Sequence, residues 1–129
     1  MNTKILIIED DPALQELLRQ VLSRAGYEVE VCRDGDDAPK QVLAFRPDLA
    51  IVDWDLPGLN GVQITRFIRS TPVTSHIPVL MMTAYNHVSH KINAFDVGVT
   101  EYITKPFNLK ELLIRVHTAF RKRVRPCVK

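Results

Sequence analysis

Two acidic residues, Asp53 and Asp55, follow directly on an apolar run in the segment LAIVDWDLPGLNG. Apolar runs belong in protein cores, whereas carboxylates are rarely buried there. A carboxylate at the end of a buried element either caps a turn or takes part in chemistry. The segment therefore raises the question of which other reactive groups gather around Asp53.

Chemically useful side chains also follow three other apolar segments. Glu9 and Asp10 follow KILII, Thr83 follows IPVLMM, and Lys105 follows EYIT. If these segments are parallel strands of one sheet, their carboxyl ends share one edge and the groups lie close together. Acids after a strand often cap the next helix, and a single Thr-Ala or Lys-Pro there is no more than a turn. Their joint occurrence at four strand ends favours a functional site.

The charges of this cluster indicate a divalent cation. Glu9, Asp10 and Asp53 carry about −3 when ionised, and Lys105 supplies a single positive charge. A hard cation with oxygen ligands, most simply Mg²⁺ (or Mn²⁺), would supply the remainder. Asp10 would bind the ion directly, Glu9 would lie nearby or act through water, and the backbone carbonyl of Asp55 would face the same ion.

Asp53 is the best candidate for a nucleophile, because it ends a central strand and carboxylates can take up a phosphoryl group. Thr83 and Lys105 would receive the phosphoryl oxygens, as a hydroxyl donor and as a point charge. Pro106 fixes the backbone after Lys105, and a cis peptide bond between these two residues fits the position. The set predicts phosphoryl transfer to Asp53.

The elements that must position these groups alternate between short apolar runs and longer amphipathic segments. The apolar runs predict strands at residues 4–8, 27–32, 49–52, 77–82 and 101–104. The helical spacing of apolar residues predicts helices at residues 12–25, 36–45, 61–69, 88–96 and 109–122. Asp10 or Asp11 would be the N-cap of the first helix, and Pro39 would lie in the first turn of a short second helix. The alternation predicts an α/β fold, a doubly wound, five-stranded parallel sheet with five helices on its two faces.

Composition narrows the function classes. The 129 residues, 46% hydrophobic and 25% charged, are ordinary for one globular domain. The apolar runs are too short for a membrane span or a signal peptide, so we expect a cytoplasmic protein without membrane contact. Cys32 and Cys127 lie far apart and are expected to be free thiols. Basic residues crowd the C-terminus, but no DNA-reading motif accompanies them, so we expect no direct nucleic-acid contact by this chain alone.

Four segments of the chain resemble the receiver domain of two-component response regulators, the CheY-like fold: ILIIEDDPAL, PDLAIVDWDLPGLNG, IPVLMMTAY and GVTEYITKPFNLKELL. The resemblance implies the strand order 2-1-3-4-5, a receiver domain over residues 1–122, and a basic tail or the start of a linker at residues 123–129. It implies that Asp53 is the phospho-acceptor, Asp10 the direct Mg²⁺ ligand and Lys105 the phosphoryl-binding lysine. Thr83 would be the switch hydroxyl, and Tyr102 the switch aromatic.

The resemblance also implies a mechanism. A histidine kinase or histidine phosphotransferase would phosphorylate Asp53, after which Thr83 would move toward the phosphoryl group and Tyr102 would fill the vacated space. The protein would catalyse its own phosphorylation and dephosphorylation only, and would not be an enzyme in any wider sense. Asp55 and Tyr85 would flank the attacking water and tune the loss of phosphate. Gly61 would allow the tight turn after the third strand.

Receivers of the OmpR/PhoB type dimerise through the face formed by the fourth helix, fifth strand and fifth helix. Here that face would comprise residues 88–96, 101–104 and 109–122. The resemblance predicts cross-subunit ion pairs between Lys91 and Glu111 and between Glu101 and Arg115, and hence weak, phosphorylation-linked dimerisation. Solvated surface charge on two helices explains the same residues equally well, because exposed ion pairs are weak.

Several readings of the output stay open. The tail FRKRVRPCVK resembles the end of a receiver that leads into a linker and an effector domain for transcriptional control, whereas the chain length favours a stand-alone phosphorelay or chemotaxis-type receiver. A degenerate, phosphate-independent scaffold would lack some of the acids, Thr83 or Lys105. The DWD motif also resembles the DxD of haloacid-dehalogenase-type phosphatases, but there it lies on the first strand and a Thr occupies the position of Pro57.

Overall fold

The computed structural model describes residues 2–84 and 96–122, and within them five parallel strands form one sheet in the order β2-β1-β3-β4-β5. The strands are β1 (Lys4–Ile8), β2 (Glu28–Cys32), β3 (Leu49–Asp53), β4 (Val79–Thr83) and β5 (Glu101–Thr104). This confirms both the predicted five-stranded parallel sheet and its strand order.

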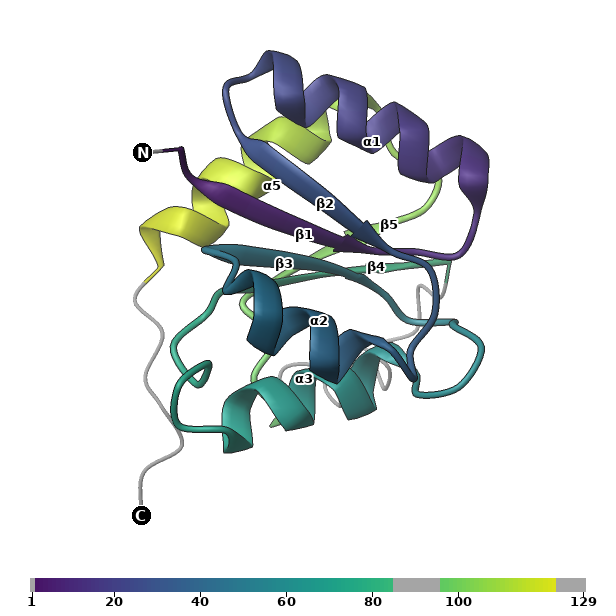
Figure 1. Ribbon diagram of the computed structural model, residues 1–129. Helices are drawn as coiled ribbons and strands as arrows, with labels where there is room; N and C mark the ends of the chain where they lie inside the picture. Colours follow the sequence, from purple (N-terminus) through teal and green to yellow (C-terminus); the bar gives the residue numbers. More distant parts are fainter. Residues whose placement is uncertain (1, 85–95, 123–129) are drawn as a thin grey trace.

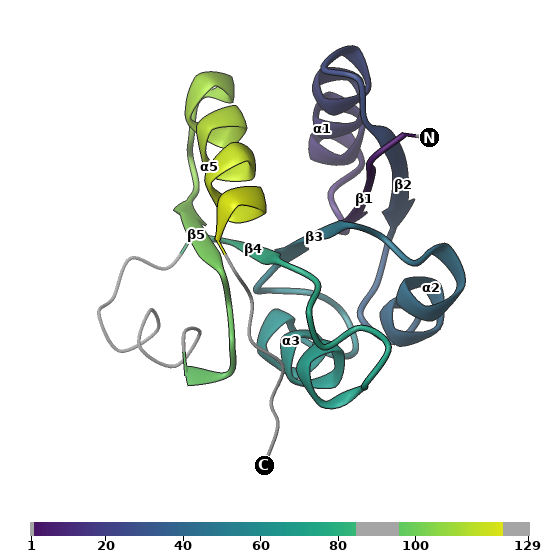
Figure 2. The same cartoon turned by 90° about the vertical axis from the view of Figure 1, so that its left-hand side faces the viewer.

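Helices cover both faces of the sheet. The described helices are α1 (Pro12–Arg24), α2 (Ala38–Phe45), α3 (Gly61–Ser70) and α5 (Leu109–Arg121). Figure 1 shows α1 and α5 on one side of the sheet and α2 and α3 on the other, and Figure 2 shows the same arrangement after a quarter turn. The helix predicted over residues 88–96 falls almost wholly outside the described residues. None of the described helices has the length and apolar character to cross a membrane.

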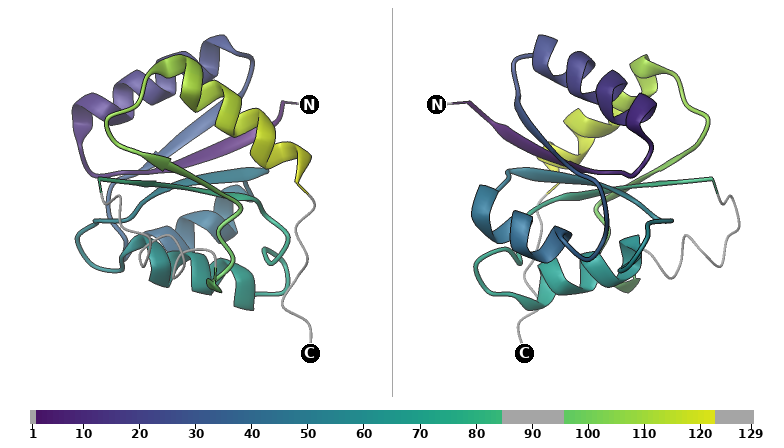
Figure 3. Two further views of the ribbon diagram at one scale, coloured as in Figure 1. Left: turned by 180° about the vertical axis from the view of Figure 1, so that it is seen from behind. Right: turned by 45° about the vertical axis from the view of Figure 1, so that its right-hand side comes forward.

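The inner strands β1, β3 and β4 are apolar because helices cover them on both faces. Ile5 and Ile7 of β1 lie in the core beneath α1 and α5, whereas Leu6 and Ile8 lie in the core on the side of α2 and α3. The alternation follows from the two-residue period of a strand. Figure 3 shows the sheet enclosed between its two helix pairs from two further directions. Since β1, β3 and β4 are buried on both faces, polar chemistry on these strands is confined to their ends.

Two strands extend one residue further toward the site than predicted. β3 includes Asp53, which pairs in register with Met82, and β4 runs over residues 79–83 rather than 77–82. Pro78 has no backbone N–H for the ladder, so β4 begins after it, and Thr83 becomes its last residue. Asp53 and Thr83 are therefore held by strand backbone rather than by flexible turns.

The first residues of α1 and α2 show which neighbouring polar side chains cap a helix and which do not. Asp11 is the N-cap of α1, and its side chain accepts a hydrogen bond from the N–H of Ala13 at 3.1 Å. The second helix begins at Ala38, with Pro39 in its first turn, two residues later than the predicted start. Because Asp11 already caps the N-terminus of α1, the Asp10 carboxylate is not needed as its cap.

Candidate metal centre at the carboxyl edge of the sheet

Three carboxylates converge where β1 and β3 end. Glu9, Asp10 and Asp53 each offer an oxygen atom, and these atoms lie within 4.8 Å of one another. Glu9 is 1% exposed and Asp53 is 5% exposed, whereas Asp10 is open to solvent. The predicted acid cluster is thus confirmed as a spatial group, with two buried members and one at the surface.

Lys105 lies between the two buried acids. Its Nζ is 3.1 Å from Glu9 Oε1 and 3.3 Å from Asp53 Oδ1. The backbone N–H of Lys105 donates to the carbonyl of Thr83 at 2.7 Å, which continues the β4–β5 pairing beyond β5. The peptide bond to Pro106 is cis, as predicted. The fifth strand therefore delivers one cation to a site built by the first and third.

One lysine does not neutralise three acids. With all four groups ionised, the cluster carries an excess of two negative charges. Buried charge without a partner is costly, so the geometry favours a further cation. The donors are all carboxylate oxygens and one of them is exposed, which fits a hard divalent ion that keeps some of its water. The cluster could therefore hold a metal ion.

Burial and charge move the pKa values of the site in opposite directions. Burial, aided by the negative charge of Glu9, raises the pKa of Asp53 to about 6, although Lys105 and the backbone N–H of Asp55 act against the rise. Burial alone would lower the pKa of Lys105, but the neighbouring carboxylates outweigh it and raise that pKa. The site thus holds a basic carboxylate beside a firmly charged ammonium group, a combination typical of reactive centres.

A residue absent from the sequence-based site supports the acid pair. Gln15 of α1 is 8% exposed, and its side-chain amide donates to the backbone carbonyl of Glu9. The N–H of Asp11 donates to Glu9 Oε2 at 3.0 Å, which fixes the carboxylate as well. The signal was present in the sequence, since Gln15 shares the apolar stripe of α1 with Leu18 and Leu22.

Thr83 and Tyr102, the expected switch pair, lie side by side. Thr83 is fully buried and Tyr102 is 7% exposed. Burial raises the pKa of Tyr102, and a side-chain hydrogen bond with Thr83 partly offsets that rise. Thr83 ends β4, whose Met82 pairs with Asp53 on β3. The hydroxyl therefore stands one residue beyond the level of Asp53, on the neighbouring strand.

Gly61 serves close packing rather than an unusual backbone angle. Its N–H donates to the carbonyl of Trp54 at 2.9 Å. A Cβ at this position would lie 2.7 Å from both the Asp53 carbonyl and the Met81 sulfur. The left-handed glycine of this loop is instead Gly58, with φ of 80°. A side chain at position 61 would consequently displace the backbone of Asp53 itself.

Three of the four residues predicted for a dimer face are already paired within one chain. Arg115 lies 3.0 Å from Glu101 and 3.8 Å from Glu111. Lys122 also reaches Glu101, at 2.6 Å, a contact that the sequence did not suggest. Lys91 lies outside the described residues, as do Tyr85 and the tail at 123–129. The structure thus shows the intrachain arrangement of this face and leaves its dimer pairs as predictions.

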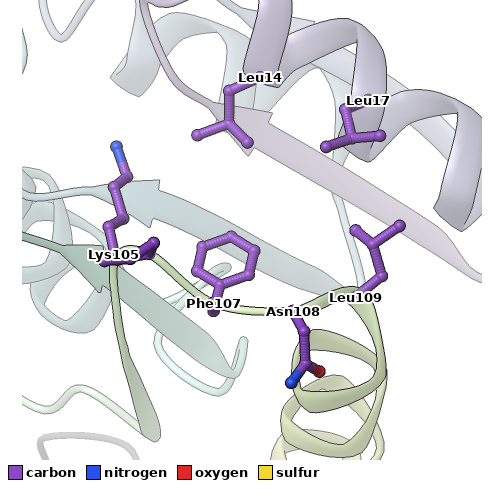
Figure 4. Close-up of a pocket in the computed structure, with 7 residues that line it drawn as sticks. Leu14, Leu17, Lys105, Phe107, Asn108 and Leu109 are labelled. Atoms are coloured by element: carbon purple, nitrogen blue, oxygen red, sulfur yellow. The ribbon is translucent and has the colours of Figure 1, made fainter.

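An apolar groove of about 490 Å³ adjoins the site. Figure 4 shows Leu14 and Leu17 of α1 facing Phe107 and Leu109 of the segment that leads into α5, with Lys105 at one end. Leu17 is 44% exposed and Leu109 is 36% exposed, so the groove is open. A partner seated there would lie within reach of the buried acids.

Known proteins resemble this chain in sequence. A family model described as response regulator receiver domain matches residues 5–117. The phosphate regulon transcriptional regulatory protein PhoB of Rhizobium meliloti is 38% identical over 122 residues, which are 95% of this chain and 54% of that protein. The chain spans about half the length of the curated relatives it matches.

Solved structures agree with the sequence relatives. A response regulator from Chloroflexus aurantiacus superposes with a TM-score of 0.88 at 37% identity, over 95% of this chain and 100% of that one. The receiver domain of a sensor histidine kinase from Pseudomonas aeruginosa gives a TM-score of 0.85 at 29% identity, with the same coverage. That structure has a magnesium ion coordinated in its active site cleft.

Proposed function

The chain belongs to the family of response regulator receiver domains, and on that premise we propose that Asp53 accepts a phosphoryl group from a histidine kinase or a histidine phosphotransferase. One observation carries this proposal. Asp53 is a buried carboxylate with a raised pKa, placed between a lysine and two further acids at the edge where parallel sheets bind ligands.

In the transfer, an Asp53 carboxylate oxygen attacks the phosphorus of the phosphohistidine. The new O–P bond forms as the P–N bond breaks, and the ring nitrogen keeps the electron pair and takes up a proton. Lys105, 3.3 Å from Asp53, offsets negative charge on the phosphoryl oxygens. Thr83 donates its hydroxyl to the product once its contact with Tyr102 rearranges. The reaction is self-catalysed and modifies only this chain.

We assign Mg²⁺, or Mn²⁺, to the acid cluster. Asp10 and Asp53 would bind the ion directly, Glu9 would act through water, and the backbone carbonyl of Asp55 would complete the protein ligands. The oxygen-only donor set and the excess negative charge support this choice. When bound, such an ion neutralises phosphoryl oxygens and lowers the barrier to their approach to a carboxylate.

The groove between α1 and the segment leading into α5 supports docking of the phosphohistidine protein. Its apolar lining combines exposed Leu17 and Leu109 with half-buried Leu14, and Lys105 joins it to the acid cluster. A partner bound there would place its histidine near Asp53 without having to enter the core. We propose a cytoplasmic location for the protein, because the phosphohistidine partner would reach it there.

The output we propose is transcriptional control through an effector domain, because the curated relatives are about twice as long and include a transcriptional regulator. Phosphorylation would change the face formed by residues 88–96, β5 and α5 and promote a weak dimer through Lys91–Glu111 and Glu101–Arg115 pairs. Sedimentation velocity with and without beryllofluoride tests the dimer, and a monomer in both at high concentration contradicts it. A stand-alone phosphorelay or chemotaxis-type receiver remains the second candidate, because a chemotaxis response regulator of Vibrio cholerae has the same fold over 99% of its chain.

The lifetime of the phosphorylated state would depend on Asp55 and Tyr85, which lie two residues beyond Asp53 and Thr83. Bulky Tyr85 would slow attack by water. We expect Tyr85→Ala to lose its phosphoryl group faster than the wild type, as followed by intact mass after removal of the phosphodonor. An unchanged rate would remove Tyr85 from this role.

The central test uses acetyl phosphate and Mg²⁺ as phosphodonor and metal. Intact-protein mass spectrometry should show one added phosphoryl group in the wild type and none in Asp53→Asn, with peptide mapping locating the group on Asp53. Chelation of the metal should abolish the addition. Equal phosphorylation of Asp53→Asn would show that the acceptor is another residue.

A further inference from the structure

The loop between β3 and α3 would supply the one backbone ligand of the proposed metal centre. The backbone carbonyl of Asp55 can approach an ion only along the path that the loop takes, since it has no rotamer to choose. The loop is fixed at both ends. Trp54 donates its N–H to the Met82 carbonyl at 2.8 Å, and Asn60 forms a capping box with Gln63 at the start of α3. The position of the Asp55 carbonyl therefore depends on the contacts that hold the middle of the loop.

Two hydrogen bonds from the turn between β2 and α2 reach that middle. The N–H of Gly35 donates to the carbonyl of Pro57 at 2.9 Å, and the N–H of Leu59 donates to Asp36 Oδ1 at 3.2 Å. We call this pair of contacts the Gly35–Asp36 clasp. In Figure 1 the connection leading from β2 into α2 and the loop after β3 lie together at the same edge of the sheet.

The clasp is packed without spare room. A Cβ at Gly35 would lie 1.7 Å from the carbonyl oxygen of Leu59. On the facing side, a Cβ at Gly58 would lie 2.5 Å from the carboxylate carbon of Asp36. Real Cβ atoms do not approach other atoms so closely, so each glycine lets one loop touch the other. The path of residues 57–59 is thereby set by the β2–α2 turn as well as by its own sequence.

We infer that Gly35 and Asp36 are positioning residues for the metal centre, acting through the β3–α3 loop on the backbone carbonyl of Asp55. This inference rests on the proposed function, because it concerns the ion assigned to Asp10 and Asp53. Asp36 is not a member of the cluster of Glu9, Asp10 and Asp53 and would contribute no ligand. It holds the segment that does, much as outer partners of metal ligands fix their orientation.

The test is Mg²⁺ affinity, measured by isothermal titration calorimetry on the full 129-residue chain. The fluorescence of Trp54, the single tryptophan and the residue next to Asp53, provides an independent titration signal. Asp36→Ala removes the acceptor of the Leu59 N–H and should weaken Mg²⁺ binding about tenfold. Asp36→Asn retains an oxygen acceptor and should bind Mg²⁺ nearly as the wild type does.

Asp37→Ala is the matched control, because it removes the same charge from the same turn and the Asp37 side chain makes no capping hydrogen bond to α2. It should leave Mg²⁺ affinity near the wild-type value. Gly35→Ala offers a second, steric variant. The φ of Gly35 is not positive, so the substitution strains the β3–α3 loop rather than its own backbone, and it should weaken Mg²⁺ binding at least as much as Asp36→Ala.

Urea unfolding without metal shows whether each variant is folded. A positioning role predicts weaker Mg²⁺ binding in variants that remain folded. Wild-type affinity in both Asp36→Ala and Gly35→Ala would overturn the inference. Equal weakening in Asp36→Ala, Asp36→Asn and Asp37→Ala would overturn it too, because the effect would then be one of net charge. A wild-type chain that binds no Mg²⁺ would overturn the proposed function itself.

Discussion

Two buried carboxylates lie at different edges of the same sheet and differ in their supply of cations. Asp53 and Glu101 are each 5% exposed. Among residues 2–84 and 96–122, Asp53 shares one cation, Lys105, with a second buried acid. Glu101 contacts two, Arg115 at 3.0 Å and Lys122 at 2.6 Å. Burial alone cannot therefore distinguish the two acids, whereas the number of nearby cations does.

The pKa values follow the cations. Burial pushes both values up, but the hydrogen bonds and charges of Lys122 and Arg115 outweigh it and lower the pKa of Glu101. For Asp53 burial prevails, and the pKa rises to about 6. A buried acid with enough cations is a structural ion pair. One with too few is held at an energetic cost and is available to a metal ion or a phosphoryl group.

The largest contrast should come from removing one cation at each site. Lys105→Met should slow phosphorylation by acetyl phosphate about 100-fold, because it removes the charge that offsets the phosphoryl oxygens. Lys122→Met removes a lysine beside Glu101 and should leave that rate near the wild type. Phosphorylation rates from a time course of intact masses measure both. Equal slowing of phosphorylation in the two variants would contradict the assignment of different roles to the two sites.

Neutralising each acid should change stability in opposite directions. In metal-free buffer at pH 8, Asp53→Asn should raise the free energy of unfolding by up to ~3 kcal/mol, because the wild type must hold a charged carboxylate whose folded pKa is about 6 against an ordinary 3.8. Glu101→Gln should instead lose stability. Urea denaturation of both variants beside the wild type provides the measurement.

The sign of the pH dependence of Asp53 follows from its raised pKa. The unfolded chain releases this proton near pH 4 and the folded chain near pH 6, so the wild type loses stability as pH rises through this window. The advantage of Asp53→Asn should hence shrink as pH falls from 7 to 4. An advantage that stays constant over this range would mean that Asp53 does not titrate as its burial predicts.

The increase in the free energy of unfolding on Mg²⁺ binding should differ between variants of the two sites by a smaller amount. At ten times its dissociation constant the ion should stabilise the wild type by about 1.4 kcal/mol, since it binds the folded chain alone. Glu101→Gln should retain this increment and Asp10→Asn should lose most of it. Thermal unfolding with and without Mg²⁺ reports the difference. An increment that survives in Asp10→Asn would place the ion elsewhere.

The smallest effect is expected at Glu101. Glu101→Gln should cost about 1 kcal/mol at neutral pH, because its partners Arg115 and Lys122 are partly exposed and solvent screens their charges. The folded pKa lies below the ordinary 4.5, so this contribution is present above that value and is lost as pH falls through the lowered pKa. Urea midpoints at pH 7 and pH 3 test it. A loss as large at pH 3 as at pH 7 would point to packing rather than charge.

Much of the site could be predicted because its residues follow strands whose apolar pattern is plain. Each strand is predicted by an apolar run, namely KILII, LAIV or EYIT. A parallel arrangement of these strands brings Glu9, Asp53 and Lys105 to one edge of the sheet, whatever the details of packing. Local chemistry also predicted the cis bond before Pro106. The predicted start of β4 was wrong, because the apolar run IPVLMM outweighed the missing backbone N–H of Pro78, after which the strand begins.

Contacts between separate loops were not predictable in the same way. The sequence around Gly35 and Asp36 is typical of an ordinary turn. It does not indicate that Pro57 and Leu59 are their hydrogen-bond partners. The pairing of Lys122 with Glu101 was likewise unexpected, since it joins the end of α5 to the start of β5. Such contacts depend on how the connections lie across the sheet edge, which residue patterns along the chain do not encode.

The sequence by itself determined the alternation of strands and helices, the gathering of acids, hydroxyl and lysine at one sheet edge, and the identity of Asp53 as the central carboxylate. These follow from periodicity and chain direction, which are local properties. The tertiary structure alone decided which acids are buried, which cation each one shares, and how the β3–α3 loop is held. Burial and charge pairing set the pKa of Asp53 apart from that of Glu101, and both arise only when distant segments pack together.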